Sequence, residues 1–190
     1  MTGRPGDRPA AELATARLVL RPLRSADLAA LVAYRRDPDV ARYQSWDVDY
    51  SAADAEGLLA EVGGVSLGDP GAGLQLAVVD RGNGTLVGDC YSRVGVDPPA
   101  TAEIGLTVAP PFQGRGLGRE AAGALVGALF ARYGLHRVLA QADERNQAIH
   151  RVLASLGFRL EGRLVEADWC KGEWTTLRVY AVLEREWAGG

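Results

Sequence analysis

The sequence predicts a single domain of the α+β or α/β class with a central mixed sheet. Segments with the apolar pattern of strands are interspersed with amphipathic segments that suit helices. The chain contains no internal repeat and no linker that would divide it. Its 190 residues, 47% hydrophobic and 24% charged, fit one soluble globular domain. We assign this domain to residues 13–188.

The first residues of the chain differ from the rest. Residues 1–12 have no apolar core and include Asp7. This composition predicts a disordered tail rather than a signal peptide.

The first part of the domain is predicted to hold one strand and two helices. Residues 17–21 alternate polar and apolar side chains, as a strand does. Ser25 suits the cap of a helix of about three turns. Ser51 and Asp54 form a capping box for a second helix that ends near residue 62.

The middle of the chain predicts a hairpin, a strand and a long helix. Residues 75–80 and 85–94 are two apolar runs joined by a turn that contains Asn83-Gly84, which favours a hairpin. Residues 103–108 form the next strand. Residues 116–133 are rich in alanine and form the long helix.

The last part of the domain closes with strand, helix and two strands. Residues 137–142 lack clean alternation, as expected of a strand with both faces buried. Residues 146–155 form a short helix that Gly157 ends. Residues 158–164 and 177–184 are predicted to pair as the closing strands.

The loop between strand 103–108 and helix 116–133 is the most informative segment. Two prolines end the strand there, because they lack N–H groups. Glycines allow a ligand to approach the backbone, arginines add positive charge, and a helix N-terminus offers unpaired N–H groups. The residues concerned are Gly114, Arg115, Gly116, Gly118 and Arg119. The loop therefore predicts a phosphate or pyrophosphate site, with a plain strand-to-helix turn as the alternative.

The two familiar nucleotide-binding motifs do not fit this loop. The P-loop pattern needs a lysine, and the only lysine of the chain is Lys171. The pattern Gly-x-Gly-x-x-Gly needs a third glycine where Arg119 stands.

Composition excludes several other classes of function. A net charge of -3 gives no basic footprint for nucleic acid, and no apolar run is long enough to span a membrane. His136 and His150 have no metal-ligand spacing, so we expect no metal site. Cys90 and Cys170 form no C-x-x-C motif and are expected to be free thiols, which fits a cytoplasmic protein, with a disulfide as the alternative.

Two segments resemble a known family. Residues 113–118, Gln-Gly-Arg-Gly-Leu-Gly, satisfy the signature Gln/Arg-x-x-Gly-x-Gly/Ala of the GNAT superfamily of acyl-CoA-dependent N-acyltransferases. Residues 146–158 resemble its second element, an Asn-led helix that closes in Leu-Gly-Phe. Residues 15–22 and 158–183 resemble the RimJ/RimL branch, whose named members acetylate the N-termini of ribosomal proteins. The resemblance covers roughly residues 15–187.

The resemblance implies a fold and a reaction. The GNAT-like sheet is central, mixed, mostly antiparallel and twisted, with about seven strands flanked by about four helices. The cosubstrate is acetyl-CoA or another acyl-CoA. The acyl group passes directly to a primary amine, such as a protein N-terminus or a small-molecule amine. The protein would be a monomer or a homodimer.

The resemblance also implies the residues that bind the cosubstrate. Backbone N–H groups from Gly114 to Arg119 would hold the pyrophosphate of coenzyme A. The backbone of residues 106–108 would pair with the pantetheine arm and hold the acyl carbonyl. Asn146 would contact the pantetheine, with a plain helix cap as its alternative role. The cofactor-binding residues are Leu106, Val108, Gln113, Gly114, Arg115, Gly116, Leu117, Gly118, Arg119 and Asn146.

The proton donor for the leaving thiolate is the open point of the mechanism. The family's usual Ser and Tyr positions hold Ile149 and Leu153, which cannot donate a proton. His150 adjoins Ile149, but one residue on a helix turns a side chain by about 100°, so we expect His150 at the surface. Water, Tyr91 and Cys90 stay as candidates.

Glu103 is the candidate base. It begins the strand 103–108, and similar proteins carry Glu there. A carboxylate could deprotonate an ammonium directly or through water. The alternative is a charge that pairs with an arginine or orients the acceptor. Asp89 is a weaker candidate base, and Cys90 as a nucleophile would need a nearby base that the sequence does not show.

The acceptor pocket is expected between the loop after the first helix and the connection before the last strand. Tyr43, Trp46, Trp169 and Trp174 lie in these segments, and aromatic walls suit an amine. Core packing is the alternative role of each tryptophan. Two other functions stay open: a non-catalytic acyl-CoA-binding or regulatory protein, and a domain that binds a different phosphate ligand at the loop.

Overall fold

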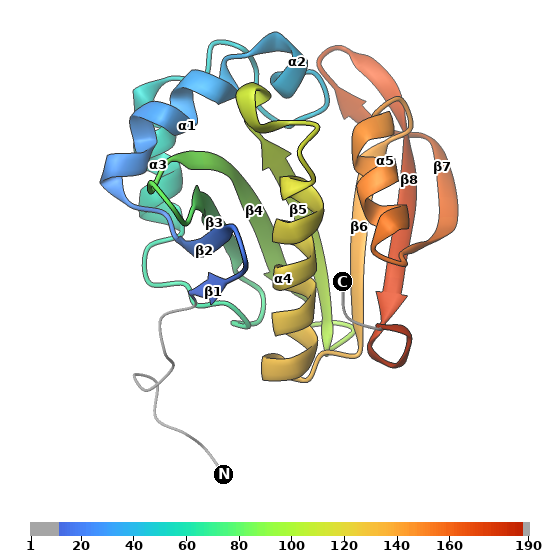
Figure 1. Ribbon diagram of the computed structural model, residues 1–190. Helices are drawn as coiled ribbons and strands as arrows, with labels where there is room; N and C mark the ends of the chain where they lie inside the picture. The colour runs from blue at the N-terminus through green and yellow to red at the C-terminus, as the bar shows by residue number, and fades with distance from the viewer. Residues whose placement is uncertain (1–11, 188–190) are drawn as a thin grey trace.

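The computed structural model describes residues 12–187 of the chain (Figure 1). Its 8 strands form one sheet in the order β1-β2-β3-β4-β5-β6-β8-β7. Within this sheet β5 and β6 are parallel, and every other neighbouring pair is antiparallel. The predicted class is confirmed. The strands are β1 (Leu13–Ala14), β2 (Leu18–Pro22), β3 (Gly73–Asp80), β4 (Leu86–Val94), β5 (Thr101–Val108), β6 (Arg137–Asp143), β7 (Arg159–Cys170) and β8 (Glu173–Leu183).

The sheet has one strand more than the expected seven. Leu13–Ala14 adds a two-residue strand, β1, beside β2. Residues 1–11 of the predicted tail, and residue 188 of the predicted domain, lie outside the described residues. The expected connection around Trp169 and Trp174 is also wrong, because β7 and β8 extend until these two residues pair with each other.

The helices include one that the sequence did not predict. Asp37 caps α2 in a segment expected to be a loop, and its carboxylate accepts the N–H of Asp39 at 2.9 Å. The predicted capping box of Ser51 and Asp54 opens α3. The α-helices are α1 (Leu28–Arg35), α2 (Pro38–Ala41), α3 (Ala52–Glu61), α4 (Leu117–Tyr133) and α5 (Gln147–Ser155).

The expected cap of the first helix is wrong. Ser25 begins a short 3-10 helix, Ser25–Asp27, and α1 follows at Leu28. The carboxylate of Asp27 accepts the backbone N–H of Arg24 at 2.8 Å and pairs with Arg21 at 2.7 Å. Asp27 therefore caps the 3-10 helix from its third position, since a carboxylate accepts backbone N–H groups at a helix start, and it makes no side-chain cap bond to α1.

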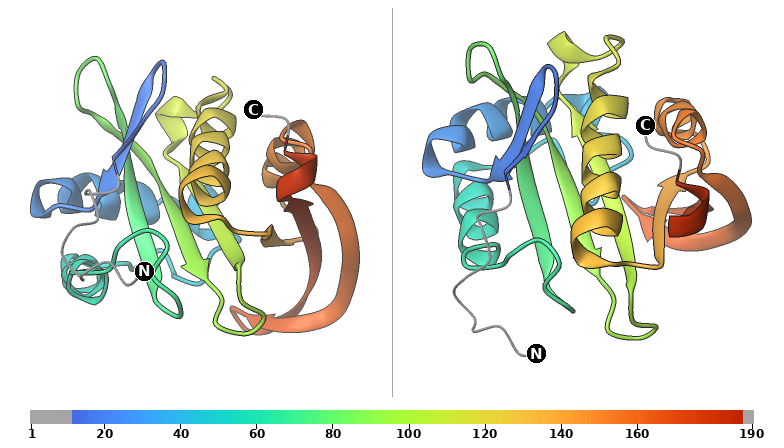
Figure 2. Two further views of the ribbon diagram at one scale, coloured as in Figure 1. Left: turned by 90° about the horizontal axis from the view of Figure 1, so that it is seen from below. Right: turned by 60° about the horizontal axis from the view of Figure 1, so that its bottom comes forward.

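Helices cover both faces of the sheet. Figure 2 shows α4 and α5 on one face and α1 and α3 on the other. The core beneath α4 and α5 includes Leu125, Leu129 and Leu153, all nearly inaccessible. A second core beneath α1 and α3 includes Leu31 and Ala77. Burial of these apolar side chains on both faces fixes the positions of the helices relative to the strands.

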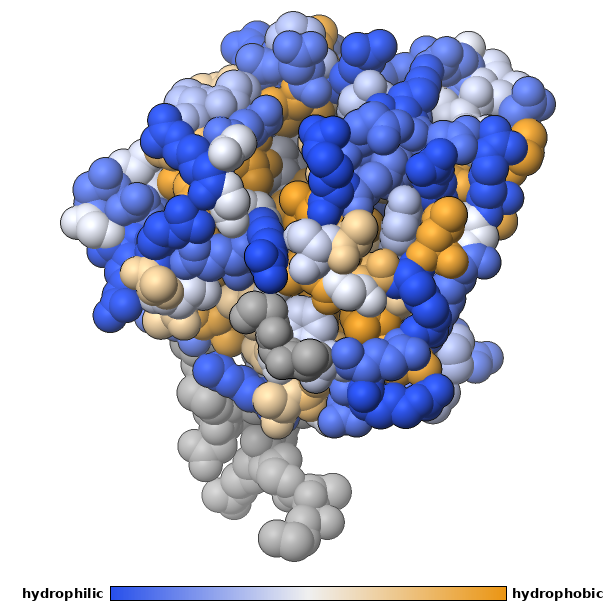
Figure 3. Space-filling view, turned by 45° about the vertical axis from the view of Figure 1, so that its right-hand side comes forward, coloured by the Kyte–Doolittle hydropathy of each residue, from blue (hydrophilic) through white to orange (hydrophobic). Residues whose placement is uncertain are grey.

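The edge strand β7 carries much of the apolar surface of the molecule. Figure 3 shows a face on which hydrophilic residues predominate and hydrophobic groups form separate patches. Large hydrophobic residues of β7 and β8 are exposed: Leu160, Leu164, Val165, Trp169 and Trp174.

The two parallel strands separate partway along their length. Their pairing joins residues 101–103 of β5 to residues 137–139 of β6 and stops there. Both strands continue, β5 to Val108 and β6 to Asp143. Over residues 104–108, β5 therefore has no strand partner on its β6 side within the described sheet. The sheet opens into a V at this point, with α4 and α5 on either side (Figure 1).

Candidate active site

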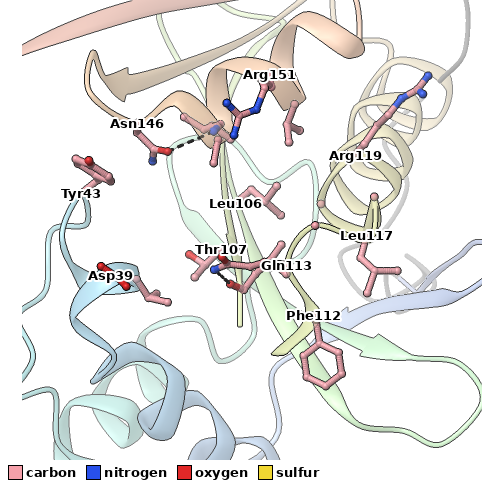
Figure 4. Close-up of a pocket in the computed structure, with 18 of the residues that line it drawn as sticks. Asp39, Tyr43, Leu106, Thr107, Phe112, Gln113, Leu117, Arg119, Asn146 and Arg151 are labelled. Carbon is pink, nitrogen blue, oxygen red and sulfur yellow. Dashed lines mark hydrogen bonds between the residues drawn. The ribbon is translucent and has the colours of Figure 1, made fainter. Parts of the chain in front are cut away.

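The opening between β5 and β6 leads into a cavity of about 590 Å³ (Figure 4). Its walls come from the α2 segment, the end of β5, the glycine-rich loop with the start of α4, and α5. Nine of the ten predicted cofactor residues line it: Leu106, Val108, Gln113, Gly114, Gly116, Leu117, Gly118, Arg119 and Asn146. The end of β5, the loop and Asn146 thus line one cavity, and residues of the α2 segment, more than 100 residues from Asn146 in sequence, complete its wall.

A smaller cavity of about 90 Å³ lies deeper, between the separated strands. Gly105 of β5 and Gln141 of β6 are among its lining residues. Leu106, Asn146 and Ile149 line both cavities, so the two spaces adjoin. A long ligand could extend from the glycine-rich loop to the point where the strands diverge.

Gln113 and two glycines give the loop its shape. The Gln113 side chain donates from Nε2 to the carbonyl oxygen of Val108 at 2.8 Å, which ties the loop to the end of β5. Gly114 and Gly116 have φ values of 73° and 75°, in the left-handed region that glycine adopts without steric cost. Gly116 occupies the N-cap position of α4.

The loop presents a row of free backbone donors. Among the described residues, no acceptor is bonded to the backbone N–H groups of residues 114–119. The helix also lacks a side-chain cap at this end. Unpaired N–H groups at a helix N-terminus, together with the helix dipole, favour an anion.

Gly118 is required for packing and also lines the cavity. A Cβ at this position would lie 3.1 Å from a methyl carbon of Leu106 and 3.3 Å from one of Val108. The start of α4 therefore packs closely on β5 because residue 118 has no side chain. A Cβ at Gly114 would meet no atom within 4 Å, so the loop is open on that side.

Arg17 and Glu120 support the loop from behind. The Arg17 guanidinium donates from Nε to Glu120 at 2.6 Å and from Nη1 to the carbonyl oxygen of Arg115 at 3.0 Å. Burial disfavours the ionised form of Glu120, but hydrogen bonds from Thr15 and Arg17 outweigh it and hold the pKa of Glu120 below its usual value. No local pattern predicts this contact, because Arg17 lies just before β2, almost 100 residues from the loop along the chain.

Of the two loop arginines, Arg119 is among the residues that line the cavity and Arg115 is not. The Arg115 guanidinium carbon lies 5.9 Å from the centre of the Phe112 ring. Arg151 of α5, which the sequence analysis missed, also lines the cavity, opposite Arg119 (Figure 4). Both side chains are exposed, and neither forms an ion pair among the described residues.

Comparison with known proteins gives the family. Residues 17–159 match the family model described as "Acetyltransferase (GNAT) domain". The chain belongs to the GNAT acetyltransferase family. A relative in Bacillus licheniformis, named an uncharacterized N-acetyltransferase p20, is 27% identical over 93% of this chain and 98% of its own length.

Solved structures of the GNAT fold superpose on most of the chain. The acetyltransferase of the GNAT family from Bacillus anthracis matches with a TM-score of 0.81 and 27% identity, over 92% of this chain and 99% of that one. Spermidine N-acetyltransferase from Vibrio cholerae, solved in complex with CoA and spermine, matches with a TM-score of 0.77 and 21% identity, over 90% and 98% of the two chains. The family resemblance and the enzyme class predicted from sequence are confirmed.

Along α5 and at its N-cap in this GNAT domain, some side chains line the cleft and others are buried in the core. Asn146 accepts the N–H of Ile149 at 3.3 Å, so its predicted capping role is confirmed, and its side chain also lines the cavity. Ile149 and Leu153 line the deeper cavity with apolar groups. The expectation that His150 lies at the surface is wrong: it is buried and stacks on Tyr180, with ring centres 5.4 Å apart.

Two candidate proton donors, Cys90 and Tyr91, do not line the cavities of the cleft. Cys90 is fully buried in the core, and burial followed by the charge of Asp89 raises the pKa of its thiol. Tyr91 lies on the opposite face of β4, and burial followed by the charge of Glu103 raises its pKa. Tyr91 lines a separate cavity beneath α3, and neither residue lines the two cavities of the cleft.

Glu103 and Asp89 occupy different surroundings. Glu103 is half-buried at the closed end of the V, opposite Arg93 of β4 and beside Leu139 of β6. It directly precedes Ile104, which lines the deeper cavity. Asp89 is fully buried and forms an ion pair with Arg35. Its carboxylate is therefore not accessible to an amine and does not suit the role of a base.

The four aromatic residues expected to line the acceptor pocket do not lie together. Tyr43 lines both cavities of the cleft. Trp46 instead covers the Arg35 guanidinium, whose carbon lies 4.0 Å from the ring centre, and packs in the second core. Trp169 and Trp174 form an edge-to-face pair with centroids 5.1 Å apart, and each remains 59% exposed.

Two further findings concern other ligands and surroundings. Within residues 12–187, no three His, Cys, Asp or Glu side chains gather in a way that could hold a metal ion. No helix in that same range has the length and apolar character needed to cross a bilayer.

Proposed function

We propose that the protein is an acetyl-CoA-dependent N-acyltransferase that transfers the acyl group directly to a primary amine. The observation that carries this proposal is the row of unpaired N–H groups of residues 114–119 beside the unpaired edge of β5. GNAT acetyltransferases use acetyl-CoA as cosubstrate, and the GNAT neighbour from Vibrio cholerae was solved with CoA.

The loop and β5 fit the two polar parts of coenzyme A. The free N–H groups of residues 114–119 suit its pyrophosphate. Within the described sheet, residues 106–108 have no strand partner on their β6 side, where Gln113 donates to the Val108 carbonyl. The remaining backbone groups on that side suit the amides of the pantetheine arm, in the manner of an added strand. Asn146, which lines both cavities, would contact the same arm with the amide group that its capping bond leaves free.

Arg119 and Arg151 fit a further phosphate. Arg119 of α4 and Arg151 of α5 both line the cavity, and neither forms an ion pair among the described residues. Guanidinium groups bind phosphate oxygens through paired hydrogen bonds. We assign to them the 3′-phosphate of coenzyme A.

Transfer to an amine requires a neutral amine and a polarised acyl carbonyl. Backbone N–H groups of residues 106–108 would polarise the carbonyl, and the cleft would fix the direction of attack. Glu103 lies three residues before Leu106, about 10 Å along the strand, and lines neither cavity of the cleft, so it would take the acceptor proton through a chain of several water molecules. Ile149 and Leu153 offer no proton, so water would protonate the thiolate.

The acceptor is proposed to be a protein N-terminus or a small-molecule amine. Tyr43 and Asp39 line the cavity from the α2 segment, and an aromatic ring with a carboxylate suits a cationic amine. We also infer a cytoplasmic location, since Cys90 and Cys170 are free thiols, as in proteins of a reducing compartment.

A thiol-release assay tests this proposal. The protein would be mixed with acetyl-CoA and a panel of primary amines: spermine, amino acids and peptides with free N-termini. Release of coenzyme A that depends on the amine, with acetylated product found by mass spectrometry, is the expected result. The Glu103→Gln variant should lower kcat and remove the acid limb of its pH profile, while the affinity for acetyl-CoA stays the same.

Apolar Ile149 and Leu153 favour a second candidate, a non-catalytic acyl-CoA-binding or regulatory protein. Saturable binding of coenzyme A by calorimetry, with no turnover of any amine, would support this candidate over the enzyme. Absence of saturable binding of coenzyme A would contradict the enzyme and the non-catalytic acyl-CoA-binding protein alike. The remaining candidate would then be a domain that binds a different phosphate ligand at the loop.

A further inference from the structure

Lys171 occupies an unusual position at the tip of the β7–β8 hairpin. Cys170 pairs with Glu173, so Lys171 and Gly172 alone form the turn. Their φ values are 52° and 82°, which are those of a two-residue turn with both residues in the left-handed region. Such turns prefer Asn-Gly, and a lysine there is strained. Backbone strain of this kind is retained where the surrounding structure or a function needs that residue in that place.

The Lys171 side chain reaches across to a distant segment. Its ammonium group lies 3.0 Å from the carbonyl oxygen of Ala41, 2.5 Å from that of Trp46 and 2.9 Å from Oδ1 of Asp47. An ammonium group has three donors, and these three oxygens can accept all of them. The contacts span more than 120 residues of sequence.

The segment held by Lys171, residues 41–47, is part of the wall of the cleft. Tyr43 and Gln44 line both cavities. A second contact reinforces the junction, because the Cys170 thiol lies 3.9 Å from the carbonyl oxygen of Gln44. The hairpin tip therefore touches the backbone on both sides of Tyr43.

Arg145 joins the same junction from a third element. It pairs with Asp143 at 2.6 Å, at the end of β6, and with Glu173 at 2.8 Å, at the start of β8. Its guanidinium carbon lies 5.9 Å from the centre of the Tyr43 ring. The α2 segment, the end of β6 and the hairpin tip thus meet beside the deeper cavity, which Tyr43 and Asp143 line.

We propose that Lys171 is a positioning residue that sets the width of the acceptor side of the cleft. Its three contacts to Ala41, Trp46 and Asp47, which we call the clasp, attach residues 41–47 to the hairpin tip. They hold Tyr43 and Gln44 as a fixed wall that the incoming amine must pass. The proposal rests on the N-acyltransferase function proposed above, and it deepens that function by naming a determinant of acceptor selectivity. The three contacts of the clasp involve none of the residues of β5, α4 and α5 proposed to hold coenzyme A.

The residue type supports this role. The chain has a single lysine among its 21 basic residues, so arginine serves every other basic position. A compact ammonium group can sit at the one point where three oxygens converge, whereas a planar guanidinium spreads its donors over a wider fork. Lysine is therefore required by the geometry of the clasp rather than by charge alone.

The test compares Lys171→Asn, Lys171→Arg and Glu166→Asn. Asparagine suits the left-handed turn better than lysine, so the first variant removes the ammonium group without harming the turn. Glu166 is also left-handed, with a φ of 48°, lies in β7 and has no side-chain partner among the described contacts, which makes Glu166→Asn the matched control. Spermine and a peptide with a free N-terminus serve as acceptors.

Lys171→Asn should raise the KM for the accepted amine by about tenfold, or admit an amine that the wild type rejects, because the wall is no longer fixed. Backbone hydrogen exchange over residues 41–47 should become about tenfold faster, by the same loss of contacts. The KM for acetyl-CoA and the Tm should not change. Lys171→Arg should show the same raised KM for the amine and the same faster exchange over residues 41–47 as Lys171→Asn. Glu166→Asn should resemble the wild type in both measurements.

Two results would overturn the clasp. One is unchanged exchange over residues 41–47 in Lys171→Asn, which can be measured whether or not any amine turns over. The other is a selectivity and KM for the amine equal to those of the wild type in an active Lys171→Asn protein. Absence of turnover in the wild type, with faster exchange in the variant, would instead reject the proposed function and keep the clasp as a structural junction.

Discussion

The Asp89 carboxylate and the Arg35 guanidinium form a buried ion pair beneath α1, with Oδ2 and Nη2 2.9 Å apart and side chains 0% and 6% exposed. The Tyr34 hydroxyl donates to the other carboxylate oxygen at 2.6 Å, and Gln75 donates to Oδ2. The ring of Trp46 covers the guanidinium. This network joins α1 to β3 and β4, so Asp89 stabilises the fold rather than the reaction.

Asp89→Asn should destabilise the protein by about 3–5 kcal/mol, because it leaves the Arg35 charge buried and unpaired. Urea unfolding would measure this loss. Asp49→Asn, a change at an exposed position, is the control and should have little effect. A stable Asp89→Asn protein with a greatly reduced kcat would show instead that Asp89 acts in the chemistry.

Gly116→Val should weaken coenzyme A binding by at least about tenfold. A residue with a Cβ in the left-handed region costs about 1–2 kcal/mol, and a branched one more, so the loop would change shape and its N–H groups would lose their alignment. Calorimetry measures the affinity. Gly84→Val is the matched control: Gly84 has a φ of 73° in a hairpin turn with no atom near its Cβ position. It should lose stability and keep the wild-type affinity.

Arg17→Ala should weaken coenzyme A binding by about fivefold or less, because it removes the support behind the loop and the pair with Glu120 is partly exposed. Arg24→Ala breaks an exposed pair with Glu12 and should leave binding unchanged. Equal affinities of wild type and Arg17→Ala would mean that the loop keeps its shape without this support.

Arg151→Ala should reduce the affinity for coenzyme A by about tenfold, as expected on loss of one charge-assisted contact to phosphate. Its affinity for 3′-dephospho-coenzyme A should equal that of the wild type. Arg132→Ala, an exposed arginine near the end of α4, provides the control. An equal loss of affinity for both ligands would contradict the assignment of the 3′-phosphate to Arg151.

Acid should destabilise the fold below about pH 4.3, the usual pKa of glutamate in unfolded chains. Hydrogen bonds from Arg137 lower the pKa of Glu161 to about 2, and those from Arg163 do the same for Glu144. A carboxylate with a lowered folded-state pKa stabilises the fold above its unfolded pKa, and the stabilisation is lost as pH falls towards 2. Tm should therefore stay level from pH 7 to about 5 and then decrease.

Glu161→Gln should have a lower Tm at neutral pH and a shallower decrease in acid, since this carboxylate no longer titrates. Thermal unfolding followed by circular dichroism at several pH values measures both. An acid slope identical to that of the wild type would exclude Glu161 as a contributor.

Much of the fold and the cofactor cleft could be predicted because their signals are local. Strand alternation, the capping box of Ser51, the Asn146 cap and the glycine loop each depend on residues near one another in sequence. The errors arose where a distant partner decides. His150 is buried because Tyr180 of β8 packs on its ring, and Trp169 lies in a strand because Trp174 pairs with it.

The sequence by itself determined the order of most elements, apart from β1 and α2, together with the family and the loop that offers its backbone to an anion, since short-range sterics and hydrogen bonding dictate these features. Only the tertiary structure decided what surrounds that loop. Arg17 lies behind it, Arg151 across from it and Lys171 at the far side of the cleft, and they come from the β1–β2 turn, α5 and the β7–β8 turn. Their roles depend on distances between segments far apart in the chain, which packing of the two cores sets and no local pattern records.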